Sequence, residues 1–288
     1  MNTLDDLLQQ GMLAHRDGDL DAASQLYQAA LHINPYLSSA HDHLGQVLLA
    51  CGSLDEGIAH LEEAVRYDPD NVRAWDHLAR VRMQLKAYAS AEYAALRAVK
   101  LRPANPHLLT RLGTAVAAQQ RFTEALQFYH QAIVLERDHY EAWLQMGITL
   151  YLRNDLAAAR SALQSAISLY ADDTTALRHL ALVELGLGHQ AGAIAQFERL
   201  LRLQPQDHDS RLDLAVILLA QQEGEAALHH LDRIAAPQRN GSKFRFYQAL
   251  ALQQTGHPRA GETLLLDLAR QHDDYALKAQ QVLQRRSA

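Results

Sequence analysis

Histidine is the residue type in this chain whose number first suggests chemistry, because a neutral imidazole is a common metal ligand. The chain holds 16 histidines among its 288 residues. His41 and His43 stand two residues apart, and His229 and His230 are adjacent. On a helix such pairs point to different faces, so neither pair predicts a chelating site.

A further set of histidines recurs at a fixed interval. His43 and His77 stand 34 residues apart, and His179 follows His77 at a multiple of that interval. Arg111 and Gln145 interrupt the series, and no carboxylate stands at the right place to complete a ligand set. We therefore predict hydrogen-bonded or solvated imidazoles, with no metal and no other cofactor.

Catalytic signatures are absent from the sequence. It has no phosphate-binding loop, dinucleotide fingerprint, nucleophile elbow or His-Glu-x-x-His pair. The single cysteine, Cys51, has no cation beside it in sequence that would activate its thiol, so we expect an inert side chain. These observations predict a protein that is not an enzyme.

Charge and composition narrow the classes of partner. The formal net charge is −6, whereas a nucleic-acid binder needs a basic surface. No run approaches the roughly 18 apolar residues of a membrane span. The lone cysteine fits a reducing compartment, and the acidic start MNTLDDLLQQG lacks the features of a signal peptide. We expect a cytoplasmic protein that binds neither nucleic acid nor membranes; its excess of arginine over lysine is typical of a GC-rich bacterial genome.

The 34-residue interval organises the whole chain. In residues 72–103 one apolar stripe at helical spacing is broken at 86–88, and a second stripe ends at Pro103. The outline indicates two antiparallel helices, neither of which can bury its apolar face alone. It returns without insertion in eight periods that start at Leu4, Ser38, Val72, Pro106, Tyr140, Thr174, His208 and Ser242.

Two positions of the period hold only small residues. Position 8 is Gly or Ala in all eight periods, and so is position 20. About a fifth of the chain is Ala or Gly, so composition does not explain this regularity. We interpret both positions as points where paired helices cross closely, and we expect a leucine there to push the helices apart.

This pattern resembles the tetratricopeptide repeat family over nearly the whole chain. The family motif has a bulky residue at position 4, here Trp75 and Trp143, a leucine at position 7, and a large residue at position 24, here Tyr27 and Tyr129. The resemblance implies an all-α fold, a right-handed superhelical α-solenoid of antiparallel helix pairs. We predict a single solenoid over residues 1–288, with eight repeats and a polar-faced capping helix at 275–286.

Departures from the family motif cluster late in the chain. Arg211 and Arg245 occupy position 4. The largest irregularity is the segment 235–242, where Pro237 should cut the second helix of the seventh repeat short. We favour an extended loop there over a hinge.

Function should lie on the first helices, whose positions 2, 5, 6, 9, 12 and 13 face away from the buried stripe and form a concave groove when repeats stack. Two predicted partner-binding zones appear there. The basic zone consists of Arg73, His77, Arg80, His107, Arg111 and Arg178. The apolar zone consists of Leu144, Ile148, Tyr151, Leu152, Leu182, Leu185, Leu212, Val216, Leu219, Phe246, Tyr247 and Leu250.

These zones predict a non-enzymatic scaffold that binds a peptide or helix of another protein, with apolar anchors and acidic residues, for instance in secretion, envelope biogenesis or enzyme recruitment. The family's carboxylate clamp for chaperone tails is not reproduced, because only Arg111 matches it and Asp42 has the wrong sign. The alternatives are that the leucines are covered by packing within the chain or by a second copy, or that the chain recruits partners for an enzyme such as a glycosyltransferase.

Overall fold

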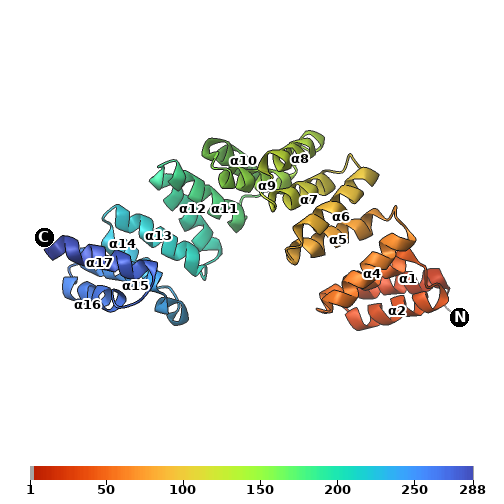
Figure 1. The fold of residues 1–288 in the computed structure, drawn as a ribbon, viewed down its shortest axis with the longest axis horizontal. Coiled ribbons are helices and arrows are strands. Elements are labelled where there is room, and N and C mark those ends of the chain that lie inside the picture. The colour runs from red at the N-terminus through yellow and green to blue at the C-terminus, as the bar shows by residue number, and fades with distance from the viewer. Residues whose placement is uncertain (1–2, 288) are drawn as a thin grey trace. The chain divides into compact units, whose positions relative to one another are not determined.

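A computed structural model describes residues 3–287, and the side chains up to 285. Within these residues the chain consists of α-helices and one 3-10 helix, without strands (Figure 1). It divides into two compact units, Met1–Arg153 (unit 1) and Asn154–Ala288 (unit 2), which are described separately. That both units form one solenoid stays a prediction.

Unit 1 contains four complete helix pairs and the first helix of the fifth repeat. Each first helix begins at the residue predicted for its period. The helices are α1 Leu4–Arg16, α2 Leu20–Ile33, α3 Ser38–Ala50, α4 Leu54–Tyr67, α5 Val72–Gln84, α6 Tyr88–Leu101, α7 Pro106–Ala117, α8 Phe122–Leu135 and α9 Tyr140–Leu152.

Unit 2 begins with the second helix of the fifth repeat. Its last helix covers the predicted capping segment. The helices are α10 Leu156–Leu169, α11 Thr174–Gly186, α12 Gln190–Leu203, α13 His208–Ala220, α14 Gly224–Leu231, the 3-10 helix η1 Ala236–Asn240, α15 Ser242–Gln254, α16 Pro258–Leu268 and α17 Asp274–Ser287. The predicted eight-repeat, all-α architecture is therefore confirmed.

The turn inside every repeat has the same backbone conformation. Position 15 has a positive φ in all eight repeats, at Gly18, Gly52, Lys86, Gln120, Asn154, Gly188, Gln222 and Gly256. In six repeats the next N–H returns to the carbonyl of position 11 at 2.8–2.9 Å, which closes the helix end in a Schellman turn. Half of the repeats make this turn without the glycine that it favours.

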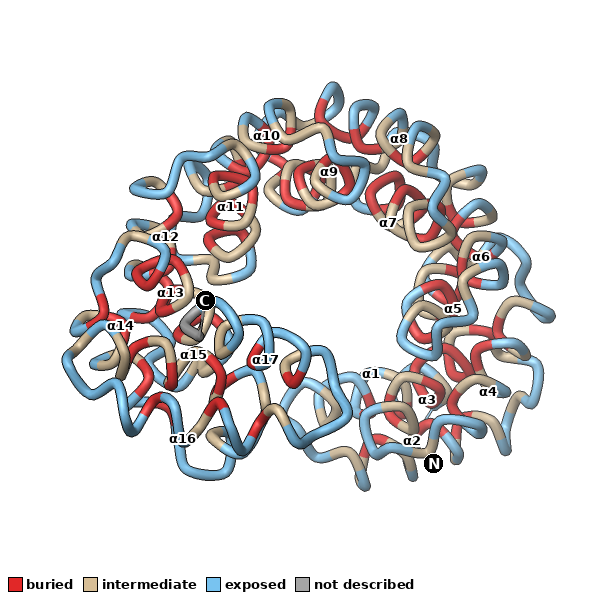
Figure 2. Tube along the Cα trace, turned by 60° about the vertical axis from the view of Figure 1, so that its left-hand side comes forward, coloured by how far each residue is buried: buried red, intermediate tan, exposed pale blue. Residues whose placement is uncertain are grey.

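The predicted crossing points are confirmed as close contacts. All sixteen residues at positions 8 and 20 are buried, and buried residues follow the faces on which helices meet (Figure 2). A Cβ added to Gly45 would lie 2.9 Å from the carbonyl oxygen of Gly57, and one added to Gly261 would lie 2.6 Å from that of Ala249. Main chain therefore touches main chain where the two helices of a repeat cross.

Position 4 carries a recurring hydrogen bond. The indole N–H groups of Trp75 and Trp143 each donate to the carbonyl six residues earlier, at 2.9 Å. His41 Nε2 lies 3.0 Å from the carbonyl of Pro35, and Arg211 donates to that of Pro205 at 2.5 Å. Arg211 is thus a buried substitute for tryptophan, because it ties down the same inter-repeat loop.

The second helix of the seventh repeat is shortened, as predicted, but not at Pro237, which lies within the 3-10 helix η1. Helix α14 ends at Leu231, and η1 follows in place of the last helical turn. Arg239 donates to the carbonyls of Ile234 and Asp232, at 2.6 and 2.5 Å, so these carbonyls keep partners although the helix has ended. The segment thus holds a 3-10 helix in place of the loop expected from the sequence, and the absence of a hinge stays a prediction.

Replacing Gln120 by glycine should stabilise unit 1 by about 0.5–1 kcal/mol, because its φ of 63° is unfavourable for a side chain with a Cβ. Urea unfolding followed by circular dichroism measures the change. Gln127→Gly, at an exposed position within α8, is the matched control and should destabilise by about 1 kcal/mol. Destabilisation by both substitutions would contradict the strain argument.

Replacing Gly45 by leucine should lower the free energy of unfolding by about 2–3 kcal/mol, since the carbonyl of Gly57 cannot move aside as a flexible side chain would. The same denaturation measurement applies. Gly241→Leu is the control, because an added Cβ there meets nothing within 4 Å and the φ is −70°. Equal effects of the two leucines would rule out close helix crossing as the cause.

Candidate functional site

The first helices of successive repeats form one layer in each unit. In unit 1, α1 lies next to α3, α3 next to α5, α5 next to α7 and α7 next to α9; in unit 2, α13 lies next to α15 and α15 next to α17. We call the surface made by positions 2, 5, 6, 9, 12 and 13 of these helices the inner face. Both predicted zones lie on it, divided between the two units.

A buried carboxylate organises the inner face of unit 1. Asp42, on α3, is 2% exposed. One of its oxygens lies 2.7 Å from His77 Nδ1 and 3.2 Å from Gln46 Nε2, and the other lies 3.7 Å from Arg73 Nε. Two residues of the predicted basic zone are therefore held by an acid of the preceding repeat.

The next repeat continues this arrangement. Arg111, on α7, forms an ion pair with Asp76 on α5. Arg80 and His107 are exposed, and Arg80 has no ion-pair partner within residues 3–287. The predicted basic zone is thus largely neutralised within the chain, because position 5 supplies a carboxylate to the following repeat. In the sequence, this pairing is indicated by acidic and basic residues 35 positions apart, as in Asp76 and Arg111.

A small polar pocket of about 260 Å³ opens beside Asp42 on the inner face. Burial lowers the pKa of His43, with a further contribution from Arg73, and its imidazole stacks on Tyr27 with ring centroids 5.2 Å apart. The neutral imidazole and two guanidinium groups suit an acidic side chain. The lining residues, which we call the polar pocket, are Met12, His15, Arg16, Tyr27, His43, Gln46 and Arg73.

The apolar zone of unit 1 is less accessible than predicted. Leu144 is buried at 8% exposure, so it belongs to the core. Ile148 and Tyr151 are half-buried on the same helix, α9. Leu144 was assigned to the inner face from helical periodicity, which does not include the burial contributed by neighbouring helices.

The same correction applies to part of unit 2. Leu219 and Phe246 are buried, at 5% and 6% exposure. Leu182, Leu185 and Leu212 are half-buried against the core around Leu177, Leu214 and Leu218. The continuous apolar surface expected from the sequence is therefore mostly covered by packing within unit 2.

The cation of the basic zone in unit 2 is also paired. Arg178, on α11, forms an ion pair with Asp207, the N-cap of α13. Burial alone would raise the pKa of Asp207, but the backbone N–H of Ser210 and the Arg178 guanidinium outweigh it, and the pKa is lowered. This carboxylate serves the helix start and the inter-repeat contact together.

An accessible part of the apolar zone remains as a pocket of about 570 Å³ between α13 and α15. Half-buried Val216, Tyr247 and Leu250 supply its apolar walls, and glutamines stand among them. Val216, Leu219, Tyr247 and Leu250 of its lining belong to the apolar zone predicted from the sequence, whereas its glutamines do not. The lining, which we call the apolar pocket, is Val216, Leu219, Ala220, Gln222, Tyr247, Leu250, Gln253 and Gln254.

A search of the described helices finds none with both the length and the apolar character needed to cross a bilayer. The helices instead form layered pairs with a repeated turn and a repeated position-4 hydrogen bond, which define a helical-repeat scaffold. Two family models, both described as tetratricopeptide repeat, match residues 44–106 and 178–242, and residues 116–182. The chain belongs to the tetratricopeptide repeat family, whose scaffold fits protein–protein interaction.

The similar proteins are longer than this chain or share little sequence identity with it. The human protein O-mannosyl-transferase TMTC3 is 25% identical over 230 residues, 74% of this chain and 25% of that protein. The chain spans about a quarter of the length of the curated relatives it matches.

Two solved structures illustrate the shared fold. PilF of Pseudomonas aeruginosa aligns with a TM-score of 0.62 and 20% identity, over 70% of this chain and 92% of that one. YrrB, a TPR protein described as having an unusual peptide-binding site, aligns with a TM-score of 0.54 and 19% identity, over 69% of this chain and 100% of that one. At these identities the likeness concerns the fold alone.

Replacing Asp42 by asparagine, which has the same shape but no charge, should destabilise unit 1 by about 1–3 kcal/mol. The reason is that Arg73 and His77 lose a buried anionic partner. Urea unfolding is the measurement. Asp70→Asn, an exposed acid in the loop before α5, serves as the control and should change stability little. If the two substitutions behave alike, the buried carboxylate does not organise this face.

Proposed function

We propose that this chain is a non-enzymatic adaptor that binds a segment of another protein on its inner face. The observation that carries the proposal is the apolar pocket between α13 and α15. Apolar side chains left partly open on the ligand-facing side of a helical repeat favour a binding surface, because burying them against a partner removes apolar area from water. The match of residues 44–106, 116–182 and 178–242 to tetratricopeptide repeat models supports the same proposal.

The apolar pocket favours a large apolar side chain set in a polypeptide. Val216, Tyr247 and Leu250 offer apolar contacts to such an anchor. Gln222 and Gln253 can donate and accept hydrogen bonds, so they suit the peptide groups on either side of the anchor. A partner with an apolar anchor flanked by backbone fits this lining better than a charged small molecule.

The polar pocket of unit 1 favours an acidic residue of the partner. Arg16 and Arg73 line it, and the side chain of Arg73 remains 60% exposed although it contacts Asp42. A guanidinium that keeps free N–H groups can bind a carboxylate in addition to its internal partner. Exposed Arg80 adds a cation on the same helix, α5. We therefore propose that the partner segment carries both apolar and acidic residues. We also propose that this protein works in a reducing compartment such as the cytoplasm.

A second candidate is a partner-recruiting part of an enzyme assembly. It is favoured by the similarity of 74% of this chain to one quarter of TMTC3, a protein O-mannosyl-transferase. On this proposal the chain would still bind polypeptide and would act beside a transferase, without carrying the catalytic groups itself.

Selection of peptides from a random displayed library on the full chain tests the proposal. We expect enrichment of peptides with a large apolar residue and nearby Asp or Glu. The affinity of these peptides, measured by fluorescence polarisation, should fall at least about tenfold, or 1.4 kcal/mol, for Val216→Glu, because a carboxylate would occupy the apolar pocket.

Leu266→Glu is the matched control, since Leu266 is an exposed leucine of α16 that does not line the pocket. Circular dichroism should show equal helical content for both variants. Failure to enrich any peptide, or equal binding by wild type and Val216→Glu, would refute the adaptor proposal in this form.

A further inference from the structure

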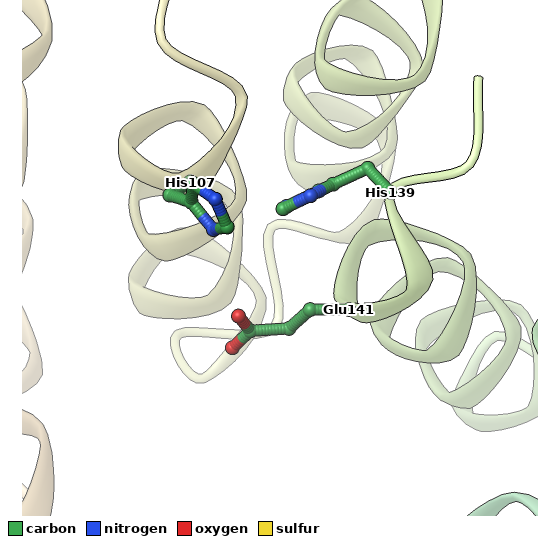
Figure 3. A group of neighbouring side chains, drawn as sticks. All are labelled: His107, His139 and Glu141. Atoms are coloured by element: carbon green, nitrogen blue, oxygen red, sulfur yellow. The ribbon is translucent and has the colours of Figure 1, made fainter. Parts of the chain in front are cut away.

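A group of side chains outside both pockets has the composition of a metal site. His107 is the second residue of α7, His139 is the N-cap of α9, and Glu141 is the second residue of α9. One ligand atom from each lies within 4.8 Å of the other two. Figure 3 shows the two imidazoles and the carboxylate converging from neighbouring helices.

His139 is the fixed member of this group. Its side chain is 4% exposed, and its buried Nε2 has no hydrogen-bond partner among the described residues. A buried polar atom without a partner is costly, and it calls for a missing ligand such as an ion. Its Nδ1 lies 3.4 Å from an oxygen of Glu136. A carboxylate on that side favours a proton on Nδ1, which leaves the lone pair of the unpartnered Nε2 available to a metal ion.

The other two members can adjust. His107 and Glu141 are exposed, and the His107 ring meets that of His139 edge to face with centroids 4.4 Å apart. In a tetrahedral zinc site the donor atoms lie about 3.4 Å from one another, for metal–ligand distances of about 2.1 Å. Closing the present separation therefore needs only side-chain rotation by the two exposed residues, while His139 stays in place.

We propose that His107, His139 and Glu141 bind a single divalent transition-metal ion, with Zn²⁺ as the best match, on the inner face of unit 1. Two imidazoles and a carboxylate are a common zinc ligand set, and a water molecule would complete the coordination. Glu136 positions His139 and does not itself bind the ion. The site is independent of the proposed peptide binding, because neither pocket includes these residues.

Calorimetric titration of the untagged, chelator-treated full chain with ZnCl₂ tests the site. We expect one tight equivalent of Zn²⁺ and an increase in the midpoint of thermal unfolding. His107→Gln and Glu141→Gln should each weaken binding at least about tenfold and remove the thermal effect. Both residues are exposed, so these variants should fold even if His139→Gln does not.

His130→Gln is the control for adventitious binding, since His130 is an exposed histidine of α8 in the same unit. It should leave the tight equivalent unchanged. Titration with Co²⁺ gives a second readout, because a tetrahedral site with imidazole ligands produces intense visible absorption that His107→Gln should abolish. Absence of a tight equivalent, or equal losses for His107→Gln and His130→Gln, would overturn the proposal.

Discussion

The structure depends on one steric constraint, the contact of main chain with main chain where the two helices of a repeat cross. The added Cβ of Gly45 would meet the carbonyl of Gly57, and the repeats that use alanine bury it completely. Because the helices approach so closely, every other residue of the repeat has a defined place. Position 24 lies in the core whether it is Tyr27, Leu163 or Phe197. Close packing at the crossing fixes the spacing between positions 8 and 20, which is the same in all eight periods.

Other positions keep an interaction while the residue type changes. Tryptophan, histidine and arginine all place a nitrogen against the carbonyl six residues before position 4. Likewise glycine, lysine, glutamine and asparagine all adopt the left-handed conformation at position 15. Every repeat reverses the chain at position 15, whereas the hydrogen bond from position 4 occurs at His41, Trp75, Trp143 and Arg211. Several side chains supply each interaction, at different energetic cost. Arg211, which looks like a departure from the family motif, therefore makes the same interaction as the tryptophans at this position.

The repeat boundaries were predictable because small residues, apolar stripes and the period all indicate the same helix pairs. The first helix of each repeat begins where the sequence predicted. The candidate site was less predictable, since it depends on neighbours 29 to 35 residues away in sequence. Asp42 and Asp76 pair with residues of the following repeat, which the pattern of a single helix does not indicate. His107 and Glu141 share position 2 of adjacent repeats, whereas the histidines that recur with the period stand at position 6, so the repeat pattern did not indicate this pair. Helical periodicity also placed Leu144, Leu219 and Phe246 on a surface, whereas packing between helices buries them.

These corrections change which groups can select a partner. A cation that is already paired with a buried carboxylate offers little net gain to a second anion, because part of its charge is neutralised and its geometry is fixed. Selectivity on the inner face must then come from groups that still have hydrogen-bond donors or apolar surface open to a partner. These groups are Arg80, the exposed side of Arg73 and the walls of the apolar pocket. If the face binds a polypeptide as proposed, it would discriminate by a few well-placed contacts. That property suits an adaptor with one preferred segment better than a surface that attracts acidic proteins in general.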